Sequence, residues 1–297
     1  MVRRASVRGG HRGQTATPVF MSGGGVRATP RPPTRTLLRR RTMIAAQQAN
    51  TWLRRYRPVE QPRVRLVCFA HAGGGPSAFR TWPAALPSDV EVVAVRYPGR
   101  QDRVTEPSVD RMEPMVAAVT EALTPLLDRP LVLFGHSMGA WIAYEVAQRM
   151  PVRALIVSGQ VPPSRRNSAR PGSARRGDHS GEFSDDVLVE EVKRLGGYDA
   201  QLFEDPELRD LVLPPIRADF TLVRTYRPGR PNLLDCPVHA CYGEDDADTR
   251  AHDVDAWAEV STGPFTAHRF PGGHFYLADH EAALLRELSS LPAVSRA

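Results

Sequence analysis

The stretch 131–150, LVLFGHSMGAWIAYEVAQRM, constrains the fold of this chain more than any other. Its short apolar beginning predicts a strand buried on both faces, and the apolar positions after it recur at helical spacing. Between the two lies a G-x-S-x-G motif, in which Gly135 and Gly139 flank Ser137. In so tight a turn, side chains at the glycine positions would collide with neighbouring backbone. The stretch therefore predicts a strand, a strained turn that exposes Ser137 as a nucleophile, and a helix whose N-terminus favours negative charge.

Other parts of the chain repeat this alternation of strand and helix. Apolar spacing predicts a helix at 112–127. Runs rich in β-branched residues predict further strands at 65–71, 90–97, 152–159, 237–243 and 265–270. This rhythm is typical of a parallel sheet with helices on both faces, so the predicted fold class is α/β.

An insertion without predicted strands interrupts the rhythm at about 160–230. Its first predicted helix is 184–197, with Ser184 as the N-cap and a glycine at the C-terminal end. Its second predicted helix is 216–226. Each helix has one apolar face that must be covered, and two such helices inserted between sheet strands predict a lid.

The positive charge of the chain is concentrated at its N-terminus. The net charge is +6, but residues 1–42 hold ten arginines and no acidic residue, which leaves −4 for residues 43–297. Residues 1–42 are rich in Gly, Pro, Thr and Arg and lack apolar periodicity, so we expect a disordered extension before a single domain, 43–297. Three interpretations of the extension are open: an upstream start artefact with Met43 as the true start, a solvated tail without a role, or a tail that binds an anionic partner. Nucleic acid is not an expected partner of the domain.

The three cysteines, Cys68, Cys236 and Cys241, have neither an even count nor a CxxC spacing. Structural disulfides and a zinc site are therefore not expected, and a reducing cytoplasm is the expected compartment. The sequence has no apolar run near the roughly 20 residues of a membrane span, and no apolar signal-peptide core follows the N-terminal arginines. We expect a cytoplasmic protein without a membrane partner.

The partners of Ser137 are expected late in the chain, because a serine hydroxyl is a weak nucleophile and needs a base. For a strand–turn–helix serine of this kind, the order along the chain is serine, acid, histidine. His274 lies between a predicted strand and a helical segment, which suits a base that reaches over the sheet edge. An acidic loop follows the strand at 237–243, and Asp246 is expected to orient His274 and stabilise its imidazolium. Asp245 is the alternative acid.

Acyl transfer also needs hydrogen-bond donors for the developing oxyanion. The backbone amide of Met138, directly after the serine, is the first candidate. The second is the amide of Ala72 in the loop 69–75, FAHAGGG, whose glycines let the backbone approach a substrate closely. His71 and Gly73 of the same loop are candidate substrate-binding residues. His71 could equally be a packing residue, and both interpretations are open.

Seven motifs occur in a fixed order along the chain. They are FAHAGGGPSAFRTW (69–82), VRYPGRQDR (95–103), GHSMGA (135–140), RLGGYD (194–199), LPPIRADF (213–220), GEDD (243–246) and FPGGHFYL (270–277). Together they resemble the stand-alone type II thioesterases that accompany polyketide and nonribosomal peptide synthases, over about residues 52–291. The resemblance implies the α/β-hydrolase fold with a helical lid.

For function, the resemblance implies hydrolysis of acyl thioesters from the phosphopantetheine arm of acyl or peptidyl carrier proteins, which removes aberrant or stalled acyl groups. Such an enzyme would act in trans on a synthase, as a monomer and without a metal or cofactor of its own. A general esterase or lipase of the same fold is the alternative, and a catalytically idle binding protein is a third hypothesis. The loop 164–183 is longer and richer in arginine than the family pattern. Its arginines either meet an acidic carrier protein or are solvated.

Overall fold

A computed structural model describes residues 51–168, 184–196, 200–229 and 232–295 of the chain. The predictions for the N-terminal extension, 1–42, and for most of the arginine-rich loop concern residues outside these ranges.

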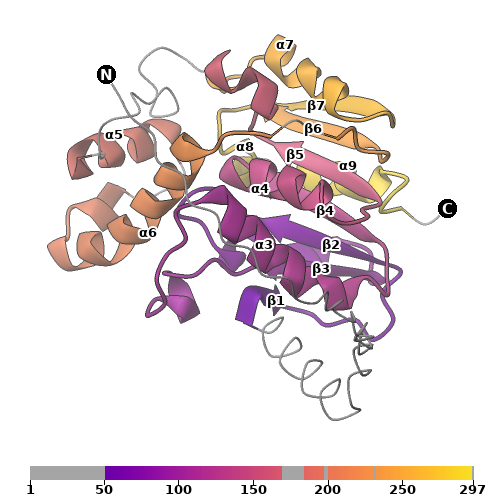
Figure 1. The fold of residues 1–297 in the computed structure, drawn as a ribbon, viewed down its shortest axis with the longest axis horizontal. Helices are drawn as coiled ribbons and strands as arrows, with labels where there is room; N and C mark the ends of the chain where they lie inside the picture. The colour runs from indigo at the N-terminus through magenta and orange to yellow at the C-terminus, as the bar shows by residue number, and fades with distance from the viewer. Residues whose placement is uncertain (1–50, 169–183, 197–199, 230–231, 296–297) are drawn as a thin grey trace, which may run out of the picture.

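A seven-stranded sheet forms the centre of the molecule, in the order β1-β3-β2-β4-β5-β6-β7 (Figure 1). β1 pairs antiparallel with β3, and every other neighbouring pair is parallel. The strands are β1 Leu53–Arg55, β2 Val64–Phe69, β3 Val90–Val95, β4 Leu131–His136, β5 Ala154–Ser158, β6 Val238–Gly243 and β7 Phe265–Phe270. The predicted strands are thus confirmed to within a few residues. β1 was not predicted, because a three-residue edge strand with two exposed arginines carries no apolar pattern.

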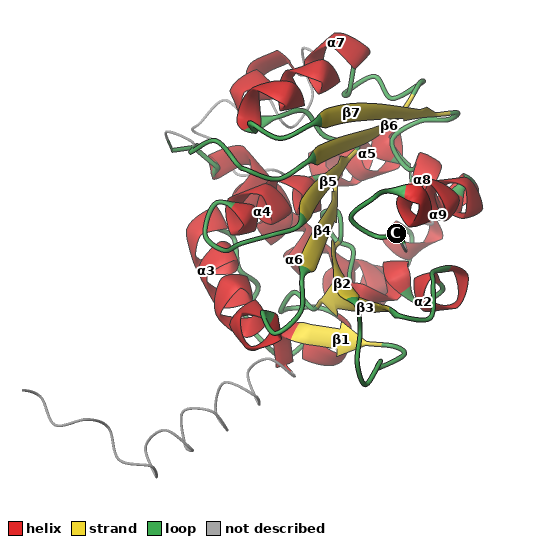
Figure 2. Ribbon diagram, turned by 90° about the vertical axis from the view of Figure 1, so that its right-hand side faces the viewer, coloured by secondary structure: helices red, strands yellow, loops and turns green. Residues whose placement is uncertain are grey.

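Helices cover both faces of the sheet, which confirms the predicted α/β architecture. Figure 2 shows α3 and α4 on one side, and α2, α8 and α9 on the other. The bounds are α2 Trp82–Ala85, α3 Met112–Leu123, α4 Met138–Ala147, α7 Ala251–Val254, α8 Tyr276–Asp279 and α9 Glu281–Ser290. The side chains of the central strands β2 to β5 are buried throughout, so the main core lies on both faces of these strands.

The two lid helices, α5 Asp185–Leu195 and α6 Pro206–Thr225, lie beyond one end of the sheet (Figure 1). As predicted, Ser184 caps α5, and its hydroxyl accepts a hydrogen bond from the amide of Val187 at 3.4 Å. α6 begins ten residues earlier than the predicted 216. The difference arises because Pro214 and Pro215, which normally break a helix, lie inside it.

The apolar faces of the lid pack mainly against each other and form a second, smaller core. It consists of Leu188, Val189, Val192, Phe203, Leu213, Ile216 and Phe220, and Ala72 of the main domain packs against it. The lid therefore has its own hydrophobic centre. It contacts the body of the protein at the glycine-rich loop and elsewhere, and Leu222 and Val223 near the end of α6 belong to the main core.

Within the described ranges, no helix is long and apolar enough to cross a bilayer. Cys68, Cys236 and Cys241 are buried free thiols.

Candidate active site

The backbone at Ser137 is strained in the way that the motif predicts. Ser137 joins β4 to α4 with φ 55° and ψ −117°, a conformation that L-residues rarely adopt. A Cβ atom on Gly135 would collide with the carbonyl of Gly139, and one on Gly139 would collide with the carbonyls of Phe69 and Ala70. The two glycines are therefore required because β4, β2 and the start of α4 approach each other closely. The strain has the character expected of a functional position.

His274 bridges the serine and the acid. Its Nε2 atom lies 2.9 Å from the hydroxyl oxygen of Ser137, and its Nδ1 atom lies 2.7 Å from Oδ2 of Asp246. All three residues are buried, with exposed fractions of 5 to 7 %. The structure thus brings together the three residues nominated from the sequence, and the carboxylate that contacts His274 is that of Asp246.

The acidic loop after β6 is held so that Asp246 stays ionised. Burial raises the pKa of Asp246, but the hydrogen bond and positive charge of His274 outweigh burial, so the net pKa lies well below the ordinary value. The backbone amide of Asp248 also donates to Oδ1 of Asp246 at 2.9 Å. The neighbouring Asp245 contacts the loop before His274 through its backbone, since its amide donates to the carbonyl of Gly272 at 3.0 Å. An ionised Asp246 suits a group that orients His274 and stabilises its imidazolium.

Two further histidines surround His274. His136 is fully buried at the end of β4, and its Nδ1 atom lies 2.9 Å from the hydroxyl of Ser158. Burial, followed by the charges of His274 and Arg100, lowers the pKa of His71 to about 3. The His71 imidazole is therefore neutral near pH 7 and adds no positive charge beside an imidazolium on His274.

The predicted oxyanion loop forms a tight turn beside Ser137. The amide of Gly74 donates to the carbonyl of His71 at 2.9 Å, and Gly73 has φ 75°, as the third residue of a type II turn requires. Ala72, the second residue of this turn, lines the cavity at Ser137. The second predicted donor, Met138, is the first residue of α4, where helix amides point toward developing negative charge. Both candidate amides thus belong to backbone next to the serine hydroxyl.

Gly73, a candidate substrate-binding residue, uses its backbone amide in a contact with the lid. It donates a 2.6 Å hydrogen bond to Oδ2 of Asp219 in lid helix α6. Arg100 binds the same carboxylate through both terminal nitrogens, at 2.5 and 2.8 Å. Sequence reasoning missed Asp219 and Arg100. One signal was present: Asp219 interrupts the apolar face that carries Ile216, and a carboxylate on an apolar face needs a buried partner.

The cavity over Ser137 is small. It has a volume of about 10 Å³, roughly the space that one water molecule needs. Ser137 and His274 bound it on one side, and Val192, Leu195 and Phe220 of the lid bound it on the other. The lid helices therefore cover the side chains of Ser137 and His274.

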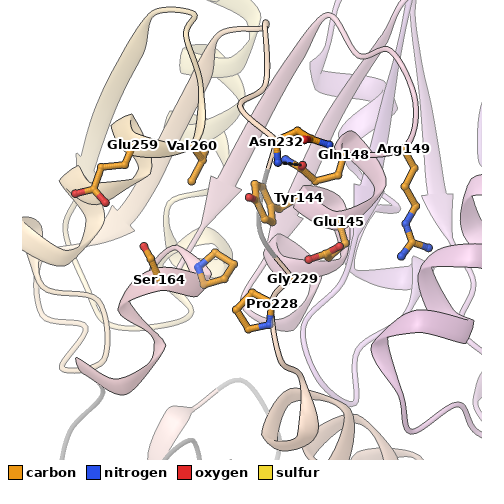
Figure 3. Close-up of a pocket in the computed structure, with 11 residues that line it drawn as sticks. Tyr144, Glu145, Gln148, Arg149, Ser164, Pro228, Gly229, Asn232, Glu259 and Val260 are labelled. Carbon is orange, nitrogen blue, oxygen red and sulfur yellow. Dashed lines mark hydrogen bonds between the residues drawn. The ribbon is translucent and has the colours of Figure 1, made fainter.

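A larger pocket of about 430 Å³ lies away from this cavity, between the outer side of α4 and the segments that precede and follow β6 (Figure 3). Tyr144, Glu145 and Glu259 line it, and neither Ser137 nor His274 does. The small cavity is the candidate catalytic site, because the predicted nucleophile, Ser137, and its predicted base, His274, line it. Among the described residues, no three His, Cys, Asp or Glu side chains are grouped as a metal site would require.

Comparisons with known proteins agree on one family. Residues 64–291 match the family model described as "Thioesterase domain". The chain is 39 % identical over 250 residues to the "Probable cadicidin biosynthesis thioesterase" of Streptomyces griseus, covering 82 % of this chain and 67 % of that protein. It is 37 % identical over 252 residues to "Thioesterase PikA5" of Streptomyces venezuelae, covering 82 % of this chain and 86 % of that protein.

A solved structure shows the same architecture. The type II thioesterase BorB from the borrelidin biosynthetic cluster superposes with a TM-score of 0.72 and 37 % sequence identity, covering 82 % of this chain and 98 % of that chain.

Proposed function

Because this chain belongs to the thioesterase-domain family and is a hydrolase of thioesters with the α/β-hydrolase fold, we propose that Ser137, His274 and Asp246 hydrolyse acyl groups from the phosphopantetheine arm of carrier proteins. The position of His274 carries this proposal. One ring nitrogen meets the nucleophile at 2.9 Å and the other meets a buried carboxylate at 2.7 Å, which is the geometry of a general base with its orienting acid.

In the acylation step, the Ser137 hydroxyl attacks the thioester carbonyl carbon and its proton passes to Nε2 of His274. The carbonyl oxygen becomes an oxyanion between the amides of Met138 and Ala72. When the carbon–sulfur bond breaks, the pantetheine thiolate takes the proton back from His274. An acyl ester of Ser137 remains, and Asp246 stabilises the transient imidazolium throughout.

In the deacylation step, His274 removes a proton from water, and the resulting hydroxide attacks the same carbonyl carbon. The ester oxygen of Ser137 leaves with the proton that His274 returns, and the free acid departs. Every proton in the cycle passes through His274, so the proposed reaction needs no metal and no redox cofactor.

Substrate entry requires the lid to open. A cavity of about 10 Å³ cannot hold an acyl thioester, so Val192, Leu195 and Phe220 must move away from Ser137 when a substrate enters. A carrier-bound thioester reaches such a site at the end of a thin, flexible arm, whereas its carrier protein stays outside. A covered site of this kind suits acyl groups delivered on an arm.

The synthase partner is proposed from the relatives. Similar proteins carry names that tie them to cadicidin and borrelidin biosynthesis, and the second of these is a type II thioesterase. We propose that this chain likewise acts in trans on carrier domains of a synthase, as a monomer, and removes aberrant or stalled acyl groups from them.

The test compares one acyl group on three leaving groups. Acyl chains are loaded on a phosphopantetheinylated carrier protein, on N-acetylcysteamine and on a simple alcohol, and release of the acid is measured for the wild type and Ser137→Ala. Faster release from the carrier, abolished in the variant, is the expected result. Equal or faster turnover of the alcohol ester would show a general esterase instead. Absence of Ser137 phosphonylation by a fluorophosphonate probe in the wild type would show that Ser137 is idle.

A further inference from the structure

Lid helix α6 places a carboxylate directly on the loop that carries a proposed oxyanion donor. Asp219 has an exposed fraction of 0 %, and both of its oxygens are hydrogen-bonded. Oδ2 accepts from the backbone amide of Gly73 at 2.6 Å and from Arg100 at 2.5 Å, and Oδ1 accepts from Arg100 at 2.8 Å. A lid residue is therefore bonded to main-chain atoms next to the nucleophile.

Arg100 joins the same arrangement from the loop after β3. Besides the two bonds to Asp219, its Nη1 atom donates to the carbonyl of Gly74 at 3.1 Å, and its guanidinium lies 5.4 Å from the ring centre of Tyr97. The side chain of Arg100 is 6 % exposed. Burying such a pair is costly in desolvation, and an apolar pair of similar size is often at least as stable. Stability alone is thus a weak reason for charges at this position.

The Gly73 amide belongs to the central peptide of the turn 71–74. In a type II turn this peptide is rotated by roughly 150° relative to a type I turn. The φ of 75° at Gly73 and the bond to Asp219 both correspond to the type II orientation. Rotation of this peptide changes ψ of Ala72 and φ of Gly73. These two dihedral angles belong to the same turn as the Ala72 amide, which is the proposed oxyanion donor. The turn therefore keeps one orientation as long as an acceptor holds the Gly73 amide.

We propose that Asp219 is a positioning residue, which holds the turn 71–74 so that the Ala72 amide faces the oxyanion. Because Asp219 is part of α6, closure of the lid completes the oxyanion hole, and opening of the lid releases it. The triad stays on the sheet loops in both states. This inference rests on the proposed role of Ser137 and Ala72, and it adds that the lid supplies part of the machinery that it covers.

Two double variants distinguish the hydrogen-bond acceptor at position 219 from the charge of the Arg100–Asp219 pair. Both replace Arg100 by Met, which removes the buried positive charge. Arg100→Met/Asp219→Asn keeps a carbonyl oxygen that can accept from the Gly73 amide, whereas Arg100→Met/Asp219→Leu has a side chain of similar shape without an acceptor. An acyl-N-acetylcysteamine thioester serves as substrate. Its trifluoromethyl ketone analogue forms a hemiketal oxyanion with Ser137, and the matching thioether resembles the ground state.

The Leu variant is expected to bind the trifluoromethyl ketone at least about tenfold more weakly than the Asn variant, with a matching loss in kcat, since removal of one oxyanion donor costs roughly 10² to 10³ in rate. Binding of the thioether should be the same in both. The Leu variant should also be at least as stable to denaturant, because the Asn variant buries an extra amide group. Equal ketone affinity and equal kcat in the two variants would overturn the proposal, as would a loss of activity that only follows a loss of stability.

A measurement on the wild-type protein tests the same proposal if one of the variants does not fold. Hydrogen exchange of the Gly73 amide should be slow and should slow further when the ketone is bound. Rapid exchange in the ketone complex would contradict the proposal. The simple thioester reports on the oxyanion hole whether or not the enzyme prefers carriers. If the enzyme turned out not to prefer carrier-bound substrates, the ketone test of Asp219 would still be valid. If Ser137 of the wild type did not react at all, the proposed serine chemistry itself would be wrong.

Discussion

Arg194 of lid helix α5 and Asp248 of the acidic loop form an ion pair, with 2.6 Å between Nη2 and Oδ2. The Asp248 side chain is fully buried, and its backbone amide donates to Asp246. Arg194 also binds Glu191 within α5, at 2.8 Å through two nitrogens. The lid thus contacts the loops of the candidate active site at two places, through α5 at the loop of Asp246 and through α6 at the glycine-rich turn.

Replacing Arg194 by Ala should weaken both the fold and the reaction. The variant leaves the carboxylate of Asp248 buried without its cation. Because the Arg194 side chain is itself 34 % exposed, water can replace part of the interaction, and we expect a loss of about 1–3 kcal/mol in the free energy of unfolding. The loop that carries Asp246 also loses support, so kcat for a simple thioester should fall. Urea denaturation and steady-state kinetics measure the two effects.

Lys193→Ala is the matched control. Lys193 lies beside Arg194 on α5, and its ion pair with Glu190 joins side chains that are 42 % and 75 % exposed. Such a pair should change stability by about 0.5 kcal/mol or less and leave kcat unchanged. Equal effects of the two variants would show that loss of positive charge on α5, rather than the contact with Asp248, is responsible.

Much of the candidate site could be predicted because local patterns place its parts. Parallel strands end at the same edge of a sheet, so loops that follow predicted strands gather there. This brought Ser137, Asp246 and His274 together as expected, although their catalytic roles stay a prediction. The strained φ of 55° at Ser137 also follows from a strand–turn–helix motif with glycines on both sides.

The contacts between lid and body could not be predicted in this way. Asp219 and its partner Arg100 are 119 positions apart in the chain, and no local period relates them. The start of α6 was also missed, because Pro214 and Pro215 resemble a helix break. Such features depend on tertiary packing, which decides whether a residue that disfavours a local structure is nevertheless accommodated.

A methyl group at Gly159 should disturb the base. Gly159 follows β5 with φ 58°, and a Cβ atom there would lie 2.6 Å from Cε1 of His136 and 3.4 Å from Cε1 of His274. Gly159→Ala should therefore displace the His136 ring, whose centre lies 5.2 Å from that of the His274 ring, and lower kcat. It should also cost about 1–2 kcal/mol in unfolding free energy from backbone strain alone. Thioester hydrolysis and thermal unfolding of the purified variant measure these losses.

Gly196→Ala is the control that distinguishes backbone strain from the contact with His136. Gly196 has φ 73° at the C-terminal end of α5, and no described atom lies within 4 Å of a Cβ placed there. Gly196→Ala should lose at least as much stability from strain, because φ 73° with ψ 165° is a region that only glycine adopts readily, and kcat should change little. If Gly159→Ala affected kcat no more than Gly196→Ala does, the His136 contact would have no bearing on the base.

Asp246→Asn should reduce turnover without unfolding the protein. An amide can keep the contact with Nδ1 of His274, but it favours the wrong tautomer and does not stabilise an imidazolium. We expect kcat to fall by roughly 10⁴. Asp245→Asn is the control, because the described bond of Asp245 comes from its backbone amide, which the substitution keeps. Steady-state rates on one thioester distinguish the two acids, and a larger loss in Asp245→Asn would reverse their assignment.

The stability of the domain should fall between neutral and mildly acidic pH, in part because of His239. Burial, and secondly the charge of His268, lowers the pKa of His239 to about 4. Since an unfolded histidine titrates near about 6.5, the unfolded chain binds this proton first. The stabilisation is therefore present above about pH 6.5 and is lost as the pH falls toward 4, by about 1–3 kcal/mol in all. Protonated His239 would face His268, 3.3 Å away, whose other nitrogen lies 3.0 Å from Glu287.

Urea denaturation at pH 7 and pH 5 measures this effect. His239→Gln keeps a side chain that can hydrogen-bond to His268 but cannot take up a proton, so its unfolding free energy should fall less between the two pH values than that of the wild type. His252→Gln is the control, because it removes a histidine whose side chain is 72 % exposed. An unchanged pH dependence in His239→Gln would mean that His268 and Glu287 accommodate the charge on His239, and that other buried groups cause the acid sensitivity.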